Sequence, residues 1–547
     1  MLCGYLKRLV DIPELECIFA VDLTTLFMKK AAIVFLSILS VLFMTPATSY
    51  AQSENDYGDD STQIVDETSA GMHNLADSKH DDHGHEPAMW AVIPFVLLLL
   101  MIATGPLFFE HFWHKNYPAV AIGLGLMVVA YYTFSLHDVD SVIHSLAEYF
   151  QFIALLAGLF MSAGGILIKV DKEGKPGVNV ILLIIGAVLA NLIGTTGASM
   201  LLIRPFIKLN KDRIKAYHVI FFIFMVSNVG GALTPIGDPP LFLGFLKGVP
   251  FAWTITHDFV PWVFAITLLS ILFIIVDSRN KSDHTSTVEY TGKISIKGTQ
   301  NFLWIAIIIA AVFIDPNVWN TVSNGEITKM VVPCIAVKLH GELVQISFIR
   351  EVLMLTVGFL SFKTANREAL KGNEFDFEPI KEVAFIFIGI FFTMMPALAL
   401  VADFAKSDEG AALINTHSLY WLTGALSGVL DNAPTYLNFF AAAFSADGGS
   451  TMNPESVKAY TEASGVFAGK NTIVHLTAIS CASVFFGAMT YIGNAPNFMV
   501  KAIAEQSGVK MPAFMTYVVK YSIPILLPIL FLVWLVFFFA DAINWFI

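Results

Sequence analysis

Two short polar motifs recur in the chain within stretches that are otherwise apolar. Gly231-Ala-Leu-Thr-Pro-Ile-Gly-Asp-Pro-Pro240 and Gly487-Ala-Met-Thr-Tyr-Ile-Gly-Asn-Ala-Pro496 share the same Gly, Ala, Thr, Ile, Gly and final Pro positions. Gly and Pro do not continue a regular helix, so backbone amides and carbonyls are freed in both segments. Within a bilayer such groups are tolerated only where they line a cavity or bind something. The repeat therefore predicts a binding site built from two interrupted helices.

Each motif follows another polar segment, Asn-Leu-Ile-Gly-Thr-Thr at 191–196 and Asp-Asn-Ala-Pro-Thr at 431–435. Hydroxyl, amide and carboxylate oxygens are suitable ligands for a hard cation such as Na⁺. The alternative is close helix packing by small residues. The candidate ion-binding or substrate-binding residues are Asn191, Thr195, Thr196, Ser227, Asn228, Thr234, Asp238, Asp431, Asn432, Thr435, Thr490 and Asn494.

Three titratable residues within these apolar stretches could carry protons: Asp238, Asp431 and His475. A carboxylate inside a bilayer is costly and is functional by default, and a histidine titrates near neutral pH. Competition between H⁺ and Na⁺ for one carboxylate is enough to produce antiport. The alternatives are helix-capping aspartates and a hydrogen-bonded structural histidine. We expect no organic cofactor and no metal beyond transported Na⁺, with H⁺ and Na⁺ as the transported or coupling ions.

Composition indicates what kind of fold must position these residues. Of 547 residues 56% are hydrophobic and 14% are charged, against about 25% charged in soluble domains. These values exclude a soluble enzyme, a disordered chain and a nucleic-acid binder, which would need a basic face. We predict an all-α polytopic membrane protein, embedded in lipid, with about 10–11 transmembrane helices. The four Cys show no motif spacing.

Apolar runs and basic loops give the expected topology. The predicted spans lie near 89–109, 118–135, 147–169, 216–247, 261–277, 302–315, 350–363, 382–401, 471–505 and 513–540. The loops expected in the cytoplasm carry Lys169/Lys172/Lys175, Lys208/Lys211/Arg213/Lys215, Arg279/Lys281/Lys293/Lys297 and Lys363/Arg367/Lys371/Lys381. The acidic stretches 136–147 and 402–410 are expected outside, and 316–349 is left unassigned.

Two segments cannot cross under these constraints, because each begins and ends on one side. Residues 178–207 and 415–445 are therefore predicted to be re-entrant hairpins of opposite orientation. Repeat 1 spans 89–278 with its broken helix at 216–247, and repeat 2 spans 302–540 with its broken helix at 471–505. A cytoplasmic loop, 279–301, joins them. This order predicts an inverted-topology repeat whose broken segments meet near the midplane.

The N-terminal region is predicted to lie outside the transporter body. Met28-Lys29-Lys30, an apolar run to Met44 and Ser49-Tyr50-Ala51 have the pattern of a secretory signal peptide. Residues 1–27 are then an upstream mis-start, and 28–51 are the signal peptide or, alternatively, a first transmembrane helix. The signal favours a bacterial inner (cytoplasmic) membrane.

Much of the formal net charge of −12 belongs to a short segment. Residues 53–86 hold ten acids and one base, Lys79, with few apolar residues. Such a segment cannot form a core, so we expect 52–88 to be an acidic, His-containing disordered tail on the periplasmic side.

The same motifs carry a family resemblance. Ser227–Pro240, Leu430–Thr435 and Tyr491–Pro496 resemble the ion transporter superfamily, which includes NhaD-type sodium/proton antiporters, citrate and dicarboxylate symporters, and arsenite permeases. The resemblance covers about residues 89–540. It implies an inverted-repeat fold, a homodimer, and a mobile transport domain built on the two hairpins. Pro239-Pro240 departs from the NhaD pattern and looks more like the permease branch, so the substrate stays open.

Two transport functions fit these residues. Sodium(lithium)/proton antiport is favoured, because two carboxylates at the site would repel a multivalent anion. The alternative is sodium- or proton-coupled citrate or dicarboxylate transport, if the hairpin tips present amides to an anion. A membrane enzyme is not expected, because the spans contain no HExxH, GxSxG or paired-Cys motif.

Overall fold

The computed structural model describes residues 87–170, 172–280, 293–323, 326–339, 342–449 and 452–539. The expectations for residues 1–86 lie outside this part of the chain. Eight of the described helices are long and apolar enough to cross a membrane. The prediction of an all-α polytopic membrane protein is therefore confirmed.

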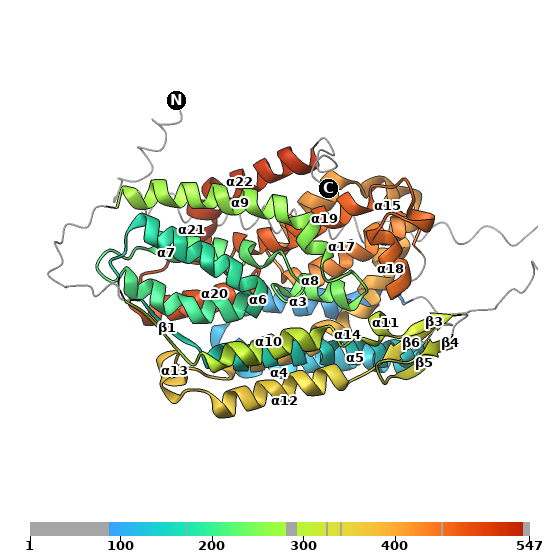
Figure 1. Ribbon diagram of the computed structural model, residues 1–547. Coiled ribbons are helices and arrows are strands. Elements are labelled where there is room, and N and C mark those ends of the chain that lie inside the picture. The colour runs from blue at the N-terminus through green and yellow to red at the C-terminus, as the bar shows by residue number, and fades with distance from the viewer. Residues whose placement is uncertain are drawn as a thin grey trace, which may run out of the picture. The chain divides into compact units, whose positions relative to one another are not determined.

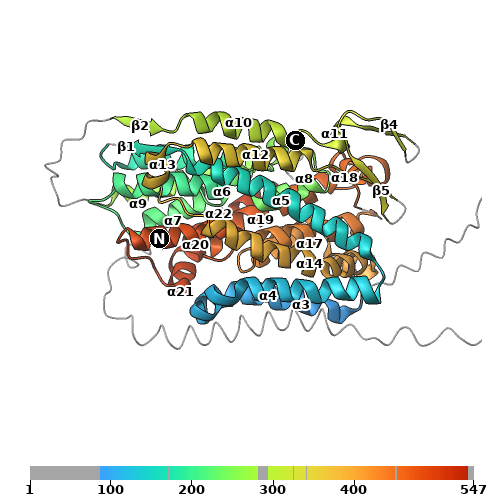
Figure 2. The same cartoon turned by 90° about the horizontal axis from the view of Figure 1, so that it is seen from below.

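Six helices pack against one another as a first bundle, in the lower half of Figure 1. They are α3 (Ile93–Phe108), α4 (Glu110–Ala130), α5 (Val139–Gly164), α10 (Gln300–Val312), α12 (Ile349–Thr364) and α14 (Glu378–Lys406). Short turns, η1 (Met89–Val92) and η2 (Tyr131–Ser135), precede α3 and follow α4. Seen from below, α4 lies beside α14, and α12 lies beside α5 (Figure 2).

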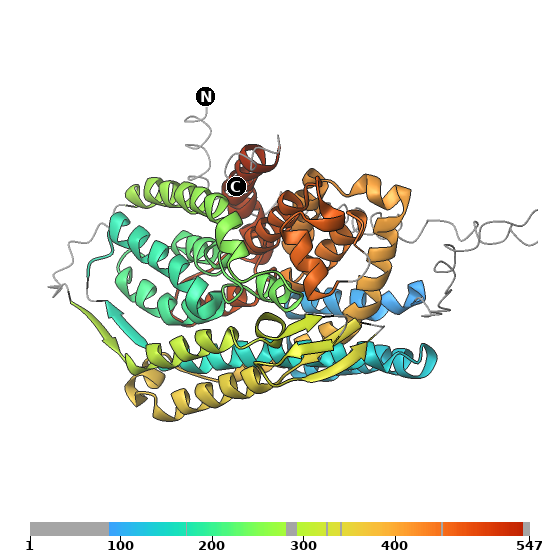
Figure 3. The ribbon, with the colours of Figure 1, turned by 45° about the vertical axis from the view of Figure 1, so that its right-hand side comes forward.

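The remaining long segments form a second bundle, which Figures 1 and 3 show above the first. Its members are α6 (Pro176–Leu209), α7 (Ala216–Met225), α8 (Pro239–Leu246), α9 (Trp253–Ser278), α16 (Thr416–Ser427), α17 (Asn432–Ala446), α19 (Thr472–Phe486) and α20 (Ala495–Gln506). The last segment runs through α21 (Phe514–Tyr517), η6 (Val518–Leu526), α22 (Leu527–Val533) and η7 (Trp534–Phe538). The two bundles meet where α5 and α14 contact α6, α8 and α17.

The two repeated motifs form the same local structure. In the first, α7 ends and a short turn, η3 (Val229–Gly231), precedes α8; in the second, η5 (Gly487–Met489) separates α19 from α20. The Thr234 hydroxyl accepts a 3.1 Å bond from the amide of Gly237, and Thr490 accepts a 3.1 Å bond from Gly493. Each break is therefore closed by its own threonine before the second half-helix begins.

The segment predicted as the first hairpin does fold back on itself. Gly194 has φ 77° and ψ 155°, a conformation that is essentially restricted to glycine. The ends of α6 lie side by side, because Asn179 and Asn210 exchange reciprocal 2.8 Å amide bonds. In the second hairpin, α16 and α17 pack against each other across a turn at 428–431.

The two ends of the structure differ in their extramembrane elements. At one, β1 (Leu167–Val170) pairs antiparallel with β2 (Ile294–Lys297). Lys297 and Lys169 both bind Glu368 in the short helix α13 (Arg367–Gly372), and these ammonium groups hold the pKa of Glu368 at about 2. The basic loops expected on one side thus meet at this end, which we call the β1 end.

The opposite end carries two β-hairpins within the segment that the sequence left unassigned. Strands β3 (Thr321–Ser323) and β4 (Glu326–Lys329) pair, as do β5 (Ile335–Leu339) and β6 (Glu342–Ile346). Short helices α11 (Pro316–Trp319), α15 (Asp408–Leu413) and α18 (Pro454–Thr461) lie at the same end in Figure 1. The base of the α6 hairpin lies at the β1 end. α15 precedes α16 and α18 follows α17, and both lie at this opposite end in Figure 1, so the two hairpins open toward opposite ends.

Three helices begin eight residues earlier than predicted, and the first is α4, which begins at Glu110 rather than 118. α5 begins at Val139 rather than 147, because Asp138 caps it by accepting a 3.0 Å bond from the amide of Ser141. α9 begins at Trp253 rather than 261, and its additional residues include the buried Asp258. The stretch 136–147 is therefore mostly the start of a helix and not a loop.

Candidate functional site

The carboxylate of Asp238 lies where the four broken segments meet. Asp238 is 1% exposed and occupies the position directly before α8. Its Oδ1 accepts a 2.7 Å bond from the Thr195 hydroxyl and a 2.9 Å bond from the Asn494 amide. Its Oδ2 accepts a 2.5 Å bond from the Asn432 amide. The three donors come from the first hairpin, the second interrupted helix and the second hairpin, so Asp238 joins all four segments.

Helix N-termini converge on this carboxylate. The second arm of α6 starts after Gly194, α8 starts at Pro239, α17 at Asn432 and α20 at Ala495. Each N-terminus carries about half a positive charge from its free amides. Among the described residues, no Lys or Arg forms an ion pair with Asp238. Helix ends and neutral donors therefore take the place of a counter-ion.

Two amide oxygens, on residues that lie close to Gly487, have no partner in the described part of the chain. They are Asn432 Oδ1 and Asn228 Oδ1. A Cβ on Gly487 would lie 2.9 Å from the Asn228 oxygen and 3.5 Å from the Asn432 amide nitrogen, so both amides lie close to this glycine. Buried polar atoms normally have partners, and free oxygens are ligands for a hard cation. With Asp238, they could hold Na⁺.

Three of the predicted site residues act as braces. Asn191 donates a 2.6 Å bond to the Gly230 carbonyl and accepts a 2.8 Å bond from the Leu233 amide. The Thr234 hydroxyl donates a 2.6 Å bond to the Asn191 carbonyl. Thr490 closes the second break, as described above. The contacts of Asn191 and Thr234 hold the tip of the first hairpin against the first break, which places Thr195 beside Asp238.

Other predicted residues surround this centre without a bond to the Asp238 carboxylate. Asp431 caps α17 by accepting a 3.0 Å bond from the Ala433 amide, and it lies within electrostatic range of Asp238. The Thr435 hydroxyl donates to the Asp431 carbonyl at 2.9 Å. Ser227 shares a 2.8 Å hydroxyl contact with Ser199. Thr196 is only half-buried.

His475 lies apart from this centre. Its Nδ1 is 2.9 Å from the Asp447 carboxylate, which also accepts a 3.0 Å bond from the Tyr460 hydroxyl. Asp447 directly follows α17 and His475 lies in the first turn of α19. The pair therefore joins the base of the second hairpin to the second interrupted helix.

Asn497 is a site residue that the motif comparison missed. Its Oδ1 accepts a 2.7 Å bond from the Asn228 amide, and its own amide donates to the carbonyls of Gly487 and Thr490. Leu241 stands at the equivalent position of the first motif, so the repeat offered no signal for it. Asn228 and Asn497 link the two interrupted helices directly.

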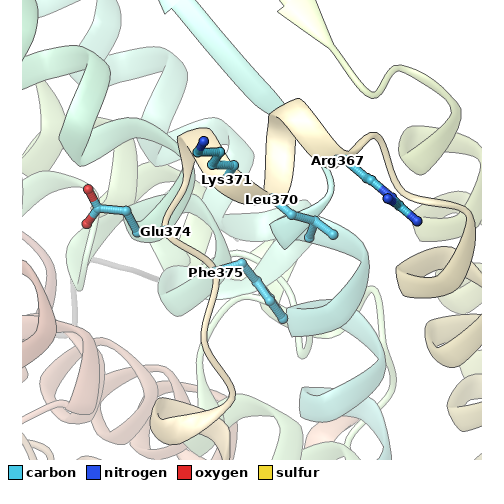
Figure 4. A pocket seen from close by; sticks show the side chains of 5 residues that line it. All are labelled: Arg367, Leu370, Lys371, Glu374 and Phe375. Atoms are coloured by element: carbon cyan, nitrogen blue, oxygen red, sulfur yellow. The ribbon is translucent and has the colours of Figure 1, made fainter.

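A surface hollow at the β1 end is distinct from the buried centre. Figure 4 shows that it is lined by Arg367, Leu370, Lys371, Glu374 and Phe375, on α13 and the turn after it. Glu374 accepts a 2.9 Å bond from Arg204 in the first hairpin. The described residues contain no group of three His, Cys, Asp or Glu side chains that could hold a metal ion.

Membrane-length helices around crossed, interrupted segments define a polytopic membrane protein of the transporter type. The family model described as "Putative citrate transport" matches residues 84–538. The chain therefore belongs to this citrate transport family, in agreement with its resemblance to the ion transporter superfamily. No curated protein matches the chain.

Proposed function

We propose that this transporter exchanges Na⁺ or Li⁺ for H⁺ at Asp238 by alternating access. The proposal rests on the environment of the Asp238 carboxylate. This group is buried and accepts hydrogen bonds from neutral donors of three other broken segments. Among the described residues, no Lys or Arg forms an ion pair with it. A site of this kind accommodates either a proton or a small cation.

The physical argument is one of competition for the same oxygens. Burying a carboxylate is costly unless it is paired or hydrogen-bonded. When Asp238 is ionised, Thr195, Asn432 and Asn494 each donate to it, and such bonds to a charge contribute on the order of 1.5–3 kcal/mol. A bound Na⁺ needs oxygen ligands, and a bound proton needs an acceptor. Rotation of the Asn432 amide would present its unpartnered oxygen for either purpose.

Coupled citrate transport is the second candidate, and the family match favours it. Converging helix N-termini attract carboxylate groups. The negative charge of Asp238 would repel a multivalent anion, so a bound Na⁺ or H⁺ would have to neutralise it first. In this case cation and citrate move in the same direction.

Proteoliposomes containing the full chain distinguish the two candidates. Vesicles are loaded with an acidic interior and a pH-sensitive dye, and Na⁺ or Li⁺ is then added outside. Antiport predicts collapse of the proton gradient when the cation is added. No collapse, together with accumulation of labelled citrate, would reject antiport and establish the second candidate.

Asp238→Asn tests the carboxylate itself. The variant keeps the size of the side chain but loses the exchangeable charge, so coupled transport is expected to fall to the level of empty vesicles. Glu368→Gln is the matched control, because Glu368 is exposed at the β1 end, outside the site. Full activity of Asp238→Asn would remove Asp238 from the mechanism.

We also propose the orientation and setting of the chain. Positive loops remain in the cytoplasm, and Lys169, Lys297 and Arg213 all lie at the β1 end. The β1 end would then face the cytoplasm of a bacterium, with residues 52–88 in the periplasm. A homodimer in the inner membrane remains part of the proposal.

A further inference from the structure

A second carboxylate is buried in the second bundle, on α9. Asp258 is 0% exposed, and the Cys481 thiol of α19 lies 3.8 Å from its Oδ1. Its Oδ2 has no hydrogen-bond partner within the described residues. No Lys, Arg or His pairs with Asp258 in that part of the chain. A thiol is a weak donor, so this carboxyl has far less support than Asp238.

Few titratable groups face Asp258 from the surrounding helices. α6, α7, α19, α22 and η3 pack against α9. Across the described residues, electrostatic contact with Asp258 comes from Cys481 and from Tyr436 of the second hairpin. The neighbouring His257 stacks on Trp253 and directs its Nδ1 to a backbone carbonyl at 2.7 Å.

An ionised carboxylate is not sustainable in this setting. The transfer of an unpaired charge into a low-dielectric interior costs several kcal/mol even after relaxation. A hard cation would need several oxygen ligands, whereas the contact that Asp258 makes is to sulfur. A proton satisfies the carboxyl without further ligands. The group therefore holds a proton in this conformation.

α9 couples Asp258 to both interrupted helices. Thr254, Asp258 and Trp262 recur every four residues and so share one face of the helix. The Thr254 hydroxyl donates to the Leu233 carbonyl at 3.0 Å, and the Trp262 indole donates to the Gly230 carbonyl at 3.2 Å. α9 is thus hydrogen-bonded to the first break through residues on both sides of Asp258, while Asp258 itself contacts α19. A relative movement of the two interrupted helices changes the surroundings of this carboxyl.

We propose that Asp258 is a second proton-binding site, which takes up and releases one proton in each transport cycle. The number of protons moved per transport cycle depends on the transport function proposed above. Protonation of Asp258, in contrast, can be measured without transport. The proton enters from the aqueous phase on one side and leaves on the other, with no covalent change. The cycle then moves one more proton than Asp238 alone accounts for.

Infrared spectroscopy of the purified full chain at alkaline pH, where exposed carboxyl groups are ionised, tests the protonation. A C=O stretching band of a protonated carboxyl is expected in the wild type, is lost in Asp258→Asn, and persists in Asp238→Asn. Cys481→Ala, which removes only the thiol contact, is expected to shift the band, and Cys481→Ser to restore it. A spectrum unchanged in Asp258→Asn and in Cys481→Ala would overturn the proposal.

Reconstituted transport tests the coupling. Asp258→Asn is expected to lower the number of protons moved per substrate ion by one and to alter the dependence on membrane potential. Asp258→Glu retains the carboxyl and should keep the wild-type ratio. An unchanged ratio in Asp258→Asn would make Asp258 structural and leave the function of Asp238 intact. Activity in Asp238→Asn would instead reject the proposed function.

Discussion

Asn494 and Asp238 occupy equivalent positions in the two halves of the chain, and the Asn494 amide donates a 2.9 Å hydrogen bond to the Asp238 carboxylate. Their backbones are nearly the same, with φ −154° and ψ 138° at Asn494 and φ −143° and ψ 146° at Asp238. Two carboxylates in this contact would repel each other. The pairing of one acid with one amide therefore replaces this repulsion by a hydrogen bond where the two interrupted helices meet.

The first prediction concerns this pair. Asn494→Ala removes one donor to a buried charge, so cation affinity is expected to change about ten- to 150-fold, the equivalent of roughly 1.5–3 kcal/mol. The transport assay with varied Na⁺ measures it as a shift in the half-saturating concentration. Asn494→Asp is expected to abolish exchange at neutral pH, because two carboxylates would then share a proton or a cation. Wild-type kinetics in both variants would contradict the role of this bond.

The second prediction concerns the glycines that let each break close on itself. A Cβ on Gly237 would lie 2.1 Å from the Gly231 carbonyl oxygen, and one on Gly493 would lie 2.6 Å from that of Gly487. Gly237→Ala and Gly493→Ala are each expected to cost about 1–3 kcal/mol through overpacking and to abolish transport. Proteoliposome transport and thermal stability in detergent measure the two effects.

Gly123→Ala is the matched control for these glycines. Gly123 lies within α4, and a Cβ there would meet nothing within 4 Å. Alanine is the better helix former by about 1 kcal/mol, so the control should be at least as stable as the wild type and fully active. An equal loss of transport and stability in Gly237→Ala, Gly493→Ala and Gly123→Ala would mean that the effect does not arise at the breaks.

The third prediction concerns the base of the first hairpin. Asp277 is 0% exposed and accepts bonds from Arg213 at 2.7 and 2.9 Å, from Tyr217 at 2.6 Å and from Asn179 at 3.0 Å. Asp277→Ala leaves Arg213 with an uncompensated charge, so about 3–5 kcal/mol of stability is expected to be lost. A maleimide dye that reacts with the buried Cys481 only on unfolding reports the melting temperature.

An exposed ion pair at the same end supplies the contrast. Glu368→Gln removes the contacts to Lys169 and Lys297, which solvent screens, and little change in melting temperature is expected. Because its pKa is lowered from 4.5 to about 2, any contribution of Glu368 is present above pH 4.5 and disappears only as pH falls toward 2. Equal destabilisation by the two variants would show that burial is not the deciding factor.

Much of the fold could be predicted because its signals are local. Hydropathy located the spans, and Gly and Pro located the breaks, since both act through residues close in sequence. The extents of α5 and α9 were predicted too short, because polar residues such as Asp138 and Asp258 lowered the apolar signal at their starts. The strands of 321–346 lie outside the spans and have no hydropathy signal.

The sequence by itself determined the class of protein and the two interrupted helices, and it offered Asp238 and Asp431 as candidate acids of the site. Only the tertiary structure decided which polar residues bind Asp238 and which brace the backbone. Asn432 and Asn494 lie 194 and 256 positions from Asp238, and no local pattern specifies such contacts. The tertiary structure alone also revealed the hydrogen-bond partners of Asn497 and the lack of a charged partner for Asp258 among the described residues. The reason is physical: a hydrogen-bond partner or its absence is set by side chains that packing brings from distant segments.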